Sequence, residues 1–370
     1  MHSFASPGWQ AWSAWATRLP PDLDLNALAR STKAIQRVRG NGISDGTGLL
    51  RLCLARGPGG MSLQEVAAWA HLEGIAELAA QSLNERLHHS VDFLAAIVHR
   101  LLAARTDSKP LLWPGRHLRI VDGSSLSQPG SKGTDWRLHV GYDLGRGGFS
   151  HLEVTDRQGA ESLLLCDPVP GEVLIADRGY AKAAELRECL VPSGPHQRDF
   201  IVRVGWKALA LRDLDEQPFS LLAQMEAMAG EMGPRDWMVQ AVVGSGRRAR
   251  LLPVRVVIMP LPPDKAEINR QKMRRKASKH QDKMDPRSLI AAGFVVLVTS
   301  LPAEIPANEI FAAYRLRWQI ELAIKWLKSV LRIDELPTRT SNGSLCWLHA
   351  HLIMALLNED LRREFLDSPP

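Results

Sequence analysis

The spacing of apolar residues changes near Pro114, and this change constrains the fold more than any other feature of the sequence. Upstream of it, apolar residues recur every three or four positions, as on one side of a helix. Downstream, short apolar runs at 118–121, 173–176, 200–204 and 294–299 alternate with helix-like segments. Such alternation is typical of a mixed α/β sheet. We therefore predict an α/β fold preceded by a helical segment.

The 370 residues of the chain are too many for one compact domain, which usually has ~100–200 residues. We expect a helical domain at 1–110, the first part of the α/β core at 111–205, a β-rich insertion at 206–290, and the second part of the core with C-terminal helices at 291–370. The insertion is expected because residues 206–290 interrupt the alternation, which resumes with a strand at 294–299 and one long helix at 307–331. A short helix is also predicted around 160–166.

The first 110 residues contain a helix start, a glycine break and further helical periodicity. Ser62 and Glu65 have the spacing of a capping box, and Gly74 interrupts the helix that follows. Helix, short turn and helix resemble a DNA-binding helix-turn-helix, but a plain helical bundle has the same periodicity. In the first case the exposed reading surface would include Asn84, Glu85, Arg86, His88 and His89.

Positive charge is concentrated in one stretch of the chain. The formal net charge is +6, and residues 265–287 contain nine Lys or Arg against three Asp or Glu, so this stretch carries the whole excess. A clustered basic surplus is typical of a nucleic-acid-facing patch, although a solvated basic loop has the same composition.

The cysteines and the apolar runs indicate the cellular compartment of the protein. Four widely spaced cysteines without a C-x-x-C pair argue against a zinc ribbon or a disulfide framework. The longest apolar run, 291–298, is far shorter than a membrane span, and residues 1–20 lack the pattern of an export signal. We expect a cytoplasmic protein with no membrane partner.

Two aspartates each follow an apolar strand-like run and precede a glycine turn. They are Asp122, in VDGSSL, and Asp177, in IADRGY. Carboxyl ends of neighbouring strands meet at one crevice in open α/β sheets, so the two carboxylates could bind a hard divalent cation there. An Asp before Gly is also a common turn, and each aspartate alone fits that reading.

The predicted helix at 307–331 gathers polar groups on one face. At ~100° per residue, five polar side chains fall within an arc of about 80°, opposite an apolar face that would pack on the sheet: Tyr314, Arg317, Glu321, Lys325 and Lys328. Ordinary i,i+4 ion pairs on a solvated face give a similar pattern. A polyanion held by the cations and a metal held by the acid would explain why one carboxylate lies among cations.

These residues resemble the DDE transposases of bacterial insertion sequences, in insertion-sequence family four with its Tyr-Arg-Glu-Lys signature. The signature spacing is complete at Tyr314, Arg317, Glu321 and Lys328, and the surroundings of both aspartates are similar to the first two acid motifs of that family. The resemblance covers roughly residues 45–335. It implies a ribonuclease-H-like core interrupted by a β-rich insertion, and an enzyme that cuts and joins DNA at the terminal inverted repeats of an insertion sequence.

The resemblance also implies a site and partners. Asp122, Asp177 and Glu321 would be the catalytic residues and would hold two Mg²⁺ ions, for which Mn²⁺ would substitute. The partners would be double-stranded DNA, at element ends and target, and a second copy of the chain in the DNA complex, associated with the bacterial nucleoid. The side chains expected to bind DNA are Tyr314, Arg317, Lys328, Lys325, Arg203, Arg274, Arg275 and Lys276.

One departure and two alternatives accompany this interpretation. Members that use a hairpin intermediate tend to place a Trp before the strand preceding the signature helix, where this chain has Phe294. The sequence therefore does not decide whether a hairpin forms, since Phe294 or Trp318 could take the place of that Trp or could simply pack in the core. A catalytically inactive, transposase-derived DNA-binding regulator would keep the same folds and basic patch. A metal-dependent phosphohydrolase of small substrates would leave the basic stretch and the N-terminal helices unexplained.

Overall fold

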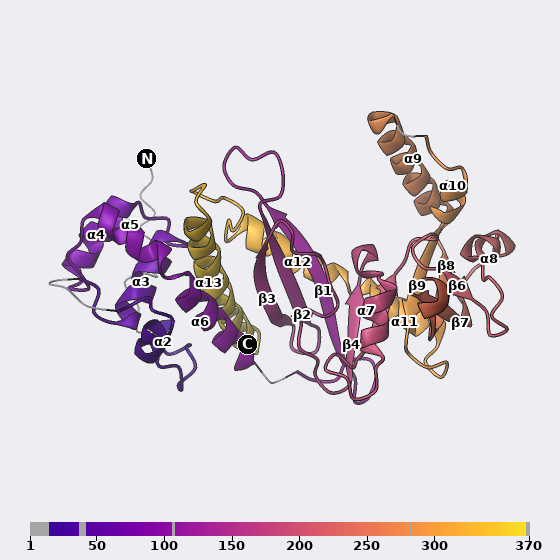
Figure 1. Cartoon of the computed structure of the whole chain (residues 1–370), viewed down its shortest axis with the longest axis horizontal. Coiled ribbons are helices and arrows are strands. Elements are labelled where there is room, and N and C mark those ends of the chain that lie inside the picture. Colours follow the sequence, from indigo (N-terminus) through magenta and orange to yellow (C-terminus); the bar gives the residue numbers. More distant parts are fainter. Residues whose placement is uncertain (1–14, 37–41, 106–107, 282, 368–370) are drawn as a thin grey trace.

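The computed structural model describes residues 15–36, 42–105, 108–281 and 283–367 (Figure 1). Parts of the predicted helical domain (1–14, 37–41 and 106–107) and residue 282 of the basic stretch lie outside the described residues. From end to end, helices come first, a sheet occupies the middle, and helix α9 projects beyond the sheet (Figure 1).

The segment before Pro114 is helical, as its periodicity predicts. It contains α2 (Leu25–Ser31), α3 (Gly46–Arg56), α4 (Leu63–Leu72), α5 (Ala80–His88) and α6 (Val91–Ala103). The capping box is confirmed: Ser62 Oγ accepts a hydrogen bond from the Glu65 N–H, and the Glu65 carboxylate accepts one from the Ser62 N–H. Gly74 ends α4 with φ +67°, a left-handed conformation that glycine adopts without strain.

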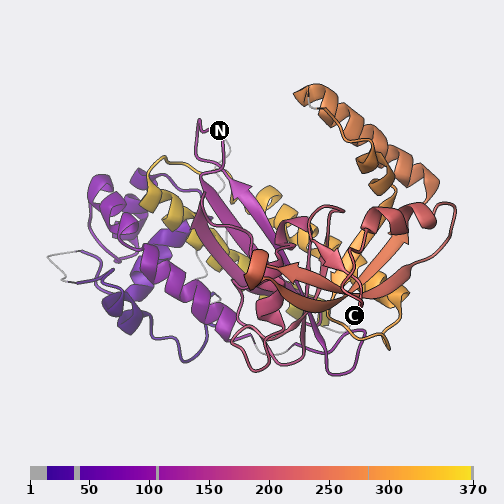
Figure 2. The same ribbon diagram turned by 45° about the vertical axis from the view of Figure 1, so that its right-hand side comes forward.

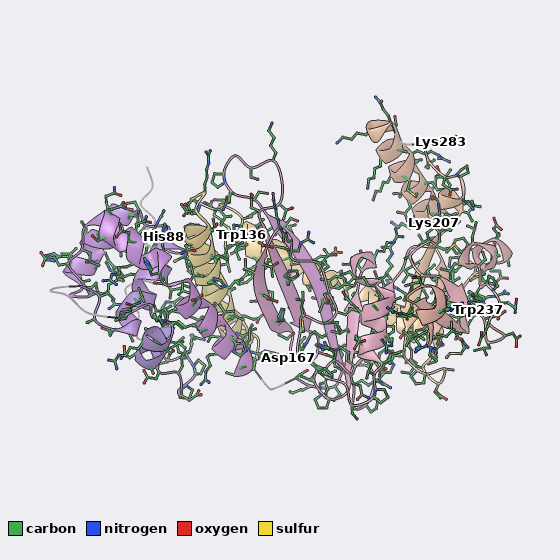
Figure 3. The ribbon with its side chains drawn as sticks, in the orientation of Figure 1. His88, Trp136, Asp167, Lys207, Trp237 and Lys283 are labelled. Carbon is green, nitrogen blue, oxygen red and sulfur yellow. The ribbon has the colours of Figure 1, made fainter. Side chains whose placement is uncertain are left out.

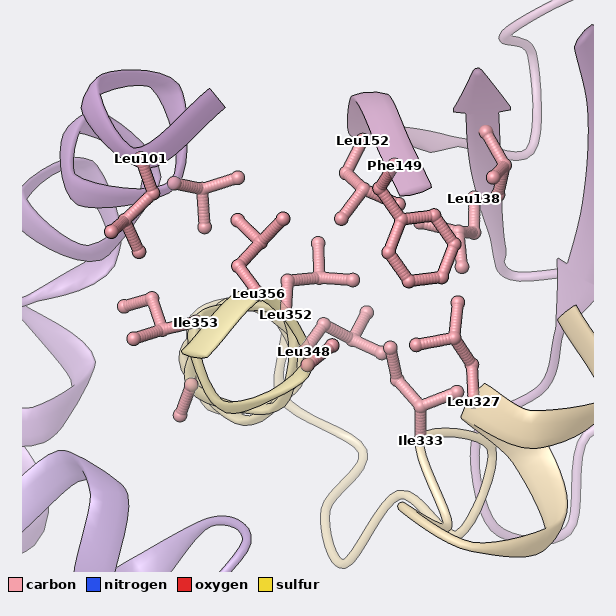
Figure 4. Packing of buried hydrophobic residues seen from close by; sticks show 14 of the residues in the cluster. Leu101, Leu138, Phe149, Leu152, Leu327, Ile333, Leu348, Leu352, Ile353 and Leu356 are labelled. Atoms are coloured by element: carbon pink, nitrogen blue, oxygen red, sulfur yellow. The ribbon is translucent and has the colours of Figure 1, made fainter. Parts of the chain in front are cut away.

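The C-terminal helix α13 (Ser341–Asp367) completes this helical layer. It packs against α3, α5 and α6, and also against the sheet. Figure 4 shows Leu101 and Ile353 on one side of α13, and Leu348, Leu352, Phe149 and Leu327 on the other. One hydrophobic core therefore runs from the N-terminal helices through α13 into the sheet.

Nine strands form one mixed sheet in the order β3-β2-β1-β4-β5-β9-β8-β7-β6 (Figure 2). β1–β2 and β2–β3 pair antiparallel, β1–β4 and β4–β5 pair parallel, and β5–β9 and the remaining neighbours pair antiparallel. The strands are β1 (His117–Leu126), β2 (Trp136–Asp143), β3 (Gly148–Asp156), β4 (Glu172–Ala176), β5 (Asp199–Arg203), β6 (Leu211–Arg212), β7 (Arg235–Val243), β8 (Arg250–Pro260) and β9 (Phe294–Thr299).

The residues predicted to form an insertion add strands to this same sheet. β8 pairs with β9, and β7 and β6 continue the sheet beyond β8. The helices in this region are α8 (Leu221–Ala227), α9 (Pro263–His280) and α10 (Arg287–Ala291). A second hydrophobic core lies under α7 (Ala183–Cys189) and α8 and includes one face of these strands.

Two local expectations were wrong. Residues 160–166 form turns and irregular backbone in place of the predicted helix. The predicted single helix at 307–331 is divided into α11 (Ala307–Arg315) and α12 (Trp318–Ser329). At the division, the N–H groups of Leu316 and Arg317 donate to carbonyls three residues back, which tightens the backbone between the two helices.

Among the described residues, no helix combines the length and the apolar character that crossing a bilayer requires.

Candidate active site

Asp122 and Asp177 lie level with each other at one end of two neighbouring parallel strands. β1 and β4 are paired up to Ile120 and Ile175, and the same register sets Asp122 opposite Asp177. Asp177 directly follows the last residue of β4 and starts the short 3₁₀ turn Arg178–Tyr180. The structure therefore brings together two aspartates that are far apart in sequence, where parallel strands commonly form functional crevices.

Glu321 reaches the same region from α12, which packs on β1 and β2. It lies in the first turn of this helix, where the helix dipole favours a negative charge. Asp122 and Glu321 line one open cleft of about 620 Å³ together with Lys325 and Lys328. Lys328 Nζ also donates to the carbonyl oxygen of Ser125 on β1, at 3.3 Å.

Arg317 connects two of the three acids. Its Nη1 lies 3.5 Å from Asp122 Oδ2, and its Nη2 donates to Glu321 Oε1. The side chain of Arg317 is only 17% exposed, whereas that of Glu321 is 54% exposed. A guanidinium held in this way compensates the two carboxylates and orients both.

Asp177 is held by two other side chains. Tyr314 Oη donates to Asp177 Oδ1 at 3.3 Å, and Arg203 Nη1 lies 3.8 Å from the same oxygen. Tyr314 is near the end of α11 and Arg317 directly precedes α12. Two neighbouring signature residues therefore lie on either side of the division between the helices and contact different aspartates.

Burial controls the protonation of this site. Burial raises the pKa of the Asp122 carboxyl, although the Gly123 N–H and the Arg317 guanidinium act in the opposite direction. Burial, together with the negative charge of Asp177, raises the pKa of Tyr314 to about 12. Tyr314 is therefore a protonated hydrogen-bond donor near neutral pH.

The three acids do not form a shared cation site in this arrangement. Within the described ranges, no group of three or more His, Cys, Asp or Glu residues is placed to hold a metal ion. Arg317 lies against both Asp122 and Glu321, while Tyr314 and Arg203 contact Asp177. The donor chemistry nevertheless fits a hard divalent cation, because carboxylate oxygens are the ligands that Mg²⁺ prefers.

The residues predicted to bind DNA fall into two places. Tyr314, Arg317, Lys325, Lys328 and Arg203 surround the acids, as described above. Arg274, Arg275 and Lys276 lie on α9, away from the acids, and are exposed. Figure 3 shows side chains projecting from α9, with Lys283 close to its end.

Sequence reasoning missed Glu161, which lies beside both aspartate-bearing segments. A Cβ built on Gly123 would lie 3.1 Å from Glu161 Cγ, and one on Gly179 would overlap the Glu161 carboxylate. Glu161 pairs with Arg137 of β2 at 3.2 Å. The helix predicted at 160–166 gave no reason to place Glu161 beside the aspartates. In the sequence, its position was signalled by a glycine close after each aspartate.

Comparison with known proteins gives consistent similarities. The profile of the family described as Transposase DDE domain matches residues 113–357. The chain is 36% identical, over 97% of its length and 96% of theirs, to the putative transposase InsL for insertion sequence element IS186A of Escherichia coli strain K12 and, over the same shares, to the transposase for insertion sequence element IS421 of Escherichia coli.

Two more distant proteins are also similar to the chain. The transposase for insertion sequence element IS231F of Bacillus thuringiensis subsp. israelensis is 23% identical over 90% of this chain and 76% of that protein. Among solved structures, the piggyBac transposase in a synaptic complex with hairpin DNA aligns with a TM-score of 0.39 and 9% identity, over 97% of this chain and 82% of that chain.

Proposed function

Because the chain belongs to the DDE transposase family of bacterial insertion sequences, we propose that it binds the terminal inverted repeats of its element and catalyses Mg²⁺-dependent strand cleavage and strand transfer. The catalytic residues are Asp122, Asp177 and Glu321. The observation that carries the proposal is their gathering, from three distant parts of the chain, around Arg317 and Tyr314.

The strand order supports a ribonuclease-H-like core in this proposal. The first five strands have the order β3-β2-β1-β4-β5, with an antiparallel β1-β2-β3 meander and parallel β1–β4 and β4–β5 pairs. In this core, Asp122 lies on the central strand, Asp177 follows its parallel neighbour, and Glu321 comes from a helix on one face.

The acids suit two divalent cations. Two Mg²⁺ ions, or Mn²⁺ in their place, would activate the attacking oxygen and stabilise the leaving oxygen of an in-line phosphoryl transfer. Asp122, Asp177 and Glu321 would hold these ions. Because Arg317 contacts Asp122 and Glu321, it must release these oxygens before they can ligate a cation.

The basic side chains around the acids, together with the Tyr314 hydroxyl, would hold DNA phosphates. Arg317 offers a planar donor fork that matches a phosphate once it leaves Glu321. Lys325 and Lys328 line the cleft beside Glu321, and Tyr314 donates from the Asp177 side. Arg203, which lies beside Asp177, supplies a further positive charge. These contacts position the scissile strand and carry no sequence information.

Recognition of the element ends falls to surfaces away from the acids. Helix α9 presents Arg274, Arg275 and Lys276 to the DNA backbone, where each engaged cation adds affinity by counterion release. The N-terminal helices supply sequence-specific contacts. Pairing two ends before cleavage requires two copies of the chain, and we propose a homodimer in the DNA complex.

The test is cleavage of duplex DNA spanning the sequence on either side of the coding region. We expect Mg²⁺-dependent nicking at the junction of element and flank, no nicking in EDTA, and none with Asp122→Asn or Asp177→Asn. Binding without nicking by the wild-type protein in Mg²⁺ or Mn²⁺ would identify a catalytically inactive DNA-binding regulator and overturn the proposal.

A further inference from the structure

Glu161 lies in the connection between β3 and β4 and is partly buried, with its side chain 28% exposed. Its Oε1 is 3.2 Å from Nη1 of Arg137 on β2. Its backbone carbonyl accepts a hydrogen bond from Lys182 Nζ, and Lys182 also pairs with Glu185 at 3.0 Å. The side chain and the backbone of Glu161 are thus held from opposite sides, by the sheet and by the start of α7.

The carboxylate of Glu161 lies against the backbone next to both aspartates. A Cβ at Gly123 would be 3.1 Å from both Glu161 Cγ and Oε1, and a Cβ at Gly179 would overlap Oε2. Gly123 directly follows Asp122, and Gly179 comes two residues after Asp177. One side chain therefore touches β1 and the turn after β4 at the same level.

The two glycines leave space for this side chain. Neither Gly123 nor Gly179 has the left-handed φ that favours glycine over other residues. Their backbone conformation is open to any amino acid, so conformational freedom does not explain them. The overlap with Glu161 does, because any side chain at 179 would displace its carboxylate.

We propose that Glu161 is a positioning residue of the catalytic site, which holds the segments bearing Asp122 and Asp177 at a fixed separation and adds negative charge beside them. The inference rests on the proposed function. Glu161 acts through Gly123, Gly179 and Arg137, and it prepares the site for a divalent cation, much as outer groups around a metal orient its ligands.

The first experiment compares Glu161→Gln with Glu153→Gln in the full-length protein. Gln keeps the shape of Glu and removes its charge. Glu153 is a matched control because it is also a partly exposed carboxylate paired with a basic side chain, His151, at 3.4 Å. The readouts are Mn²⁺ binding without DNA, by electron paramagnetic resonance, and the Mg²⁺ concentration that gives half-maximal cleavage.

We expect Glu161→Gln to weaken Mn²⁺ binding by about tenfold and to raise the half-maximal Mg²⁺ concentration by a similar factor. Glu153→Gln should leave both within about twofold, and the melting temperatures of the two variants should agree. Equal behaviour of the two variants in both metal readouts would overturn the inference.

The second experiment tests the contact itself with Gly179→Ala, alone and combined with Glu161→Ala. In the wild-type background the added methyl group displaces the Glu161 carboxylate, so Mn²⁺ binding should weaken by about tenfold. In the Glu161→Ala background the space is vacant, and the same change should cost less than about twofold, since coupled residues are not additive. Equal losses in both backgrounds would overturn the inference.

The two proposals fail differently. If the wild-type protein neither binds Mn²⁺ nor cleaves DNA, the proposed function and the role of Glu161 both fall. If the wild-type protein cleaves, Asp122→Asn does not, and Glu161→Gln behaves as Glu153→Gln does, only the role of Glu161 falls.

Discussion

The two halves of the sheet use positive charge in different ways. In the half formed by β3-β2-β1-β4-β5, arginines are committed to acids: Arg203 contacts Asp177, and Arg317 contacts Asp122 and Glu321. In the half formed by β9-β8-β7-β6, helix α9 presents Arg275, Lys276 and Lys279, and no acidic side chain of the described residues pairs with these three.

The difference separates two tasks. Cations beside partly buried carboxylates offset their desolvation and fix their geometry, whereas exposed cations without partners remain available to a polyanion. Under the proposed function, catalysis and DNA binding would lie in different halves of one continuous sheet, and variants in each half should fail in different assays.

The largest effect is expected for Glu321→Gln, beside the half of the sheet formed by β3-β2-β1-β4-β5. Loss of one metal-binding carboxylate should lower the rate of DNA cleavage by about a thousandfold, since metal stabilisation of the transition state is worth several kcal/mol. DNA binding should persist. Asp334→Asn is the control, because Asp334 lines the same cleft and is exposed. Similar losses in both variants, measured by single-turnover cleavage, would contradict the assignment of Glu321.

The next effect concerns the stability of the half of the sheet formed by β9-β8-β7-β6. Arg255 of β8 is 2% exposed and donates to Asp236 at 2.6 Å, to Pro302 O at 2.8 Å and to Ile305 O at 2.7 Å. Arg255→Met should lower the free energy of unfolding by about 3 kcal/mol, because it removes the three hydrogen bonds made by a buried guanidinium, each of which contributes about 1 kcal/mol.

Urea unfolding measures this loss. Arg235→Met on β7 is the control, since Arg235 is 52% exposed and pairs with Glu231 at the surface; its cost should stay below about 1 kcal/mol. Equal costs would mean that Arg255 does not fasten β8 to the connection between β9 and α11.

A smaller effect is expected from replacing Arg275, Lys276 and Lys279 together by Ala. If each contacts one phosphate, the slope of log K against log salt should fall by about 3, and DNA affinity at physiological salt by up to about a hundredfold. Cleavage of DNA already bound should keep its rate.

The control for the α9 variant replaces Arg247, Arg248 and Arg250, which are exposed at the opposite end of β8 from α9. Fluorescence anisotropy titrations at several salt concentrations measure both variants. An equal slope change in the control would show that overall charge, and not α9, determines DNA affinity.

The smallest effect is expected for Tyr314→Phe, which removes the hydrogen bond to Asp177. A bond of this kind contributes about 1 kcal/mol, so cleavage should slow about fivefold. Rapid-quench measurements at saturating Mg²⁺ would detect this change, and an unaltered rate would show that the Asp177 hydrogen bond does not contribute to cleavage.

The sequence predicted features that have a local cause. Ser62 and Glu65 form the expected capping box, and the apolar runs before Asp122 and Asp177 form strands whose register sets these residues level. The apolar face expected for the signature helix is also present, with Ile320 and Leu327 fully buried.

Features with a distant cause escaped prediction. The division between α11 and α12 falls at Leu316 and Arg317, where no Pro or Gly marks a helix end in the sequence. Glu161 lies in irregular backbone, where periodicity says nothing about contacts. The packing of α13 on the N-terminal helices likewise depends on partners more than 200 residues earlier. The sequence of α13 alone does not indicate which helices it contacts.

The joint at the base of α9 has a mechanical consequence. Pro262 and Pro263 each fix φ where β8 leads into the helix. Asn269 and Arg270 then bond to the carbonyls of Ala292 and Leu289, at 3.3 and 3.2 Å. Beyond these two anchors, α9 continues to His280 for ten more residues, about 15 Å. A force on this end of α9 would act on β8. It would pass through the β8–β9 and β9–β5 pairings to the strand that carries Arg203.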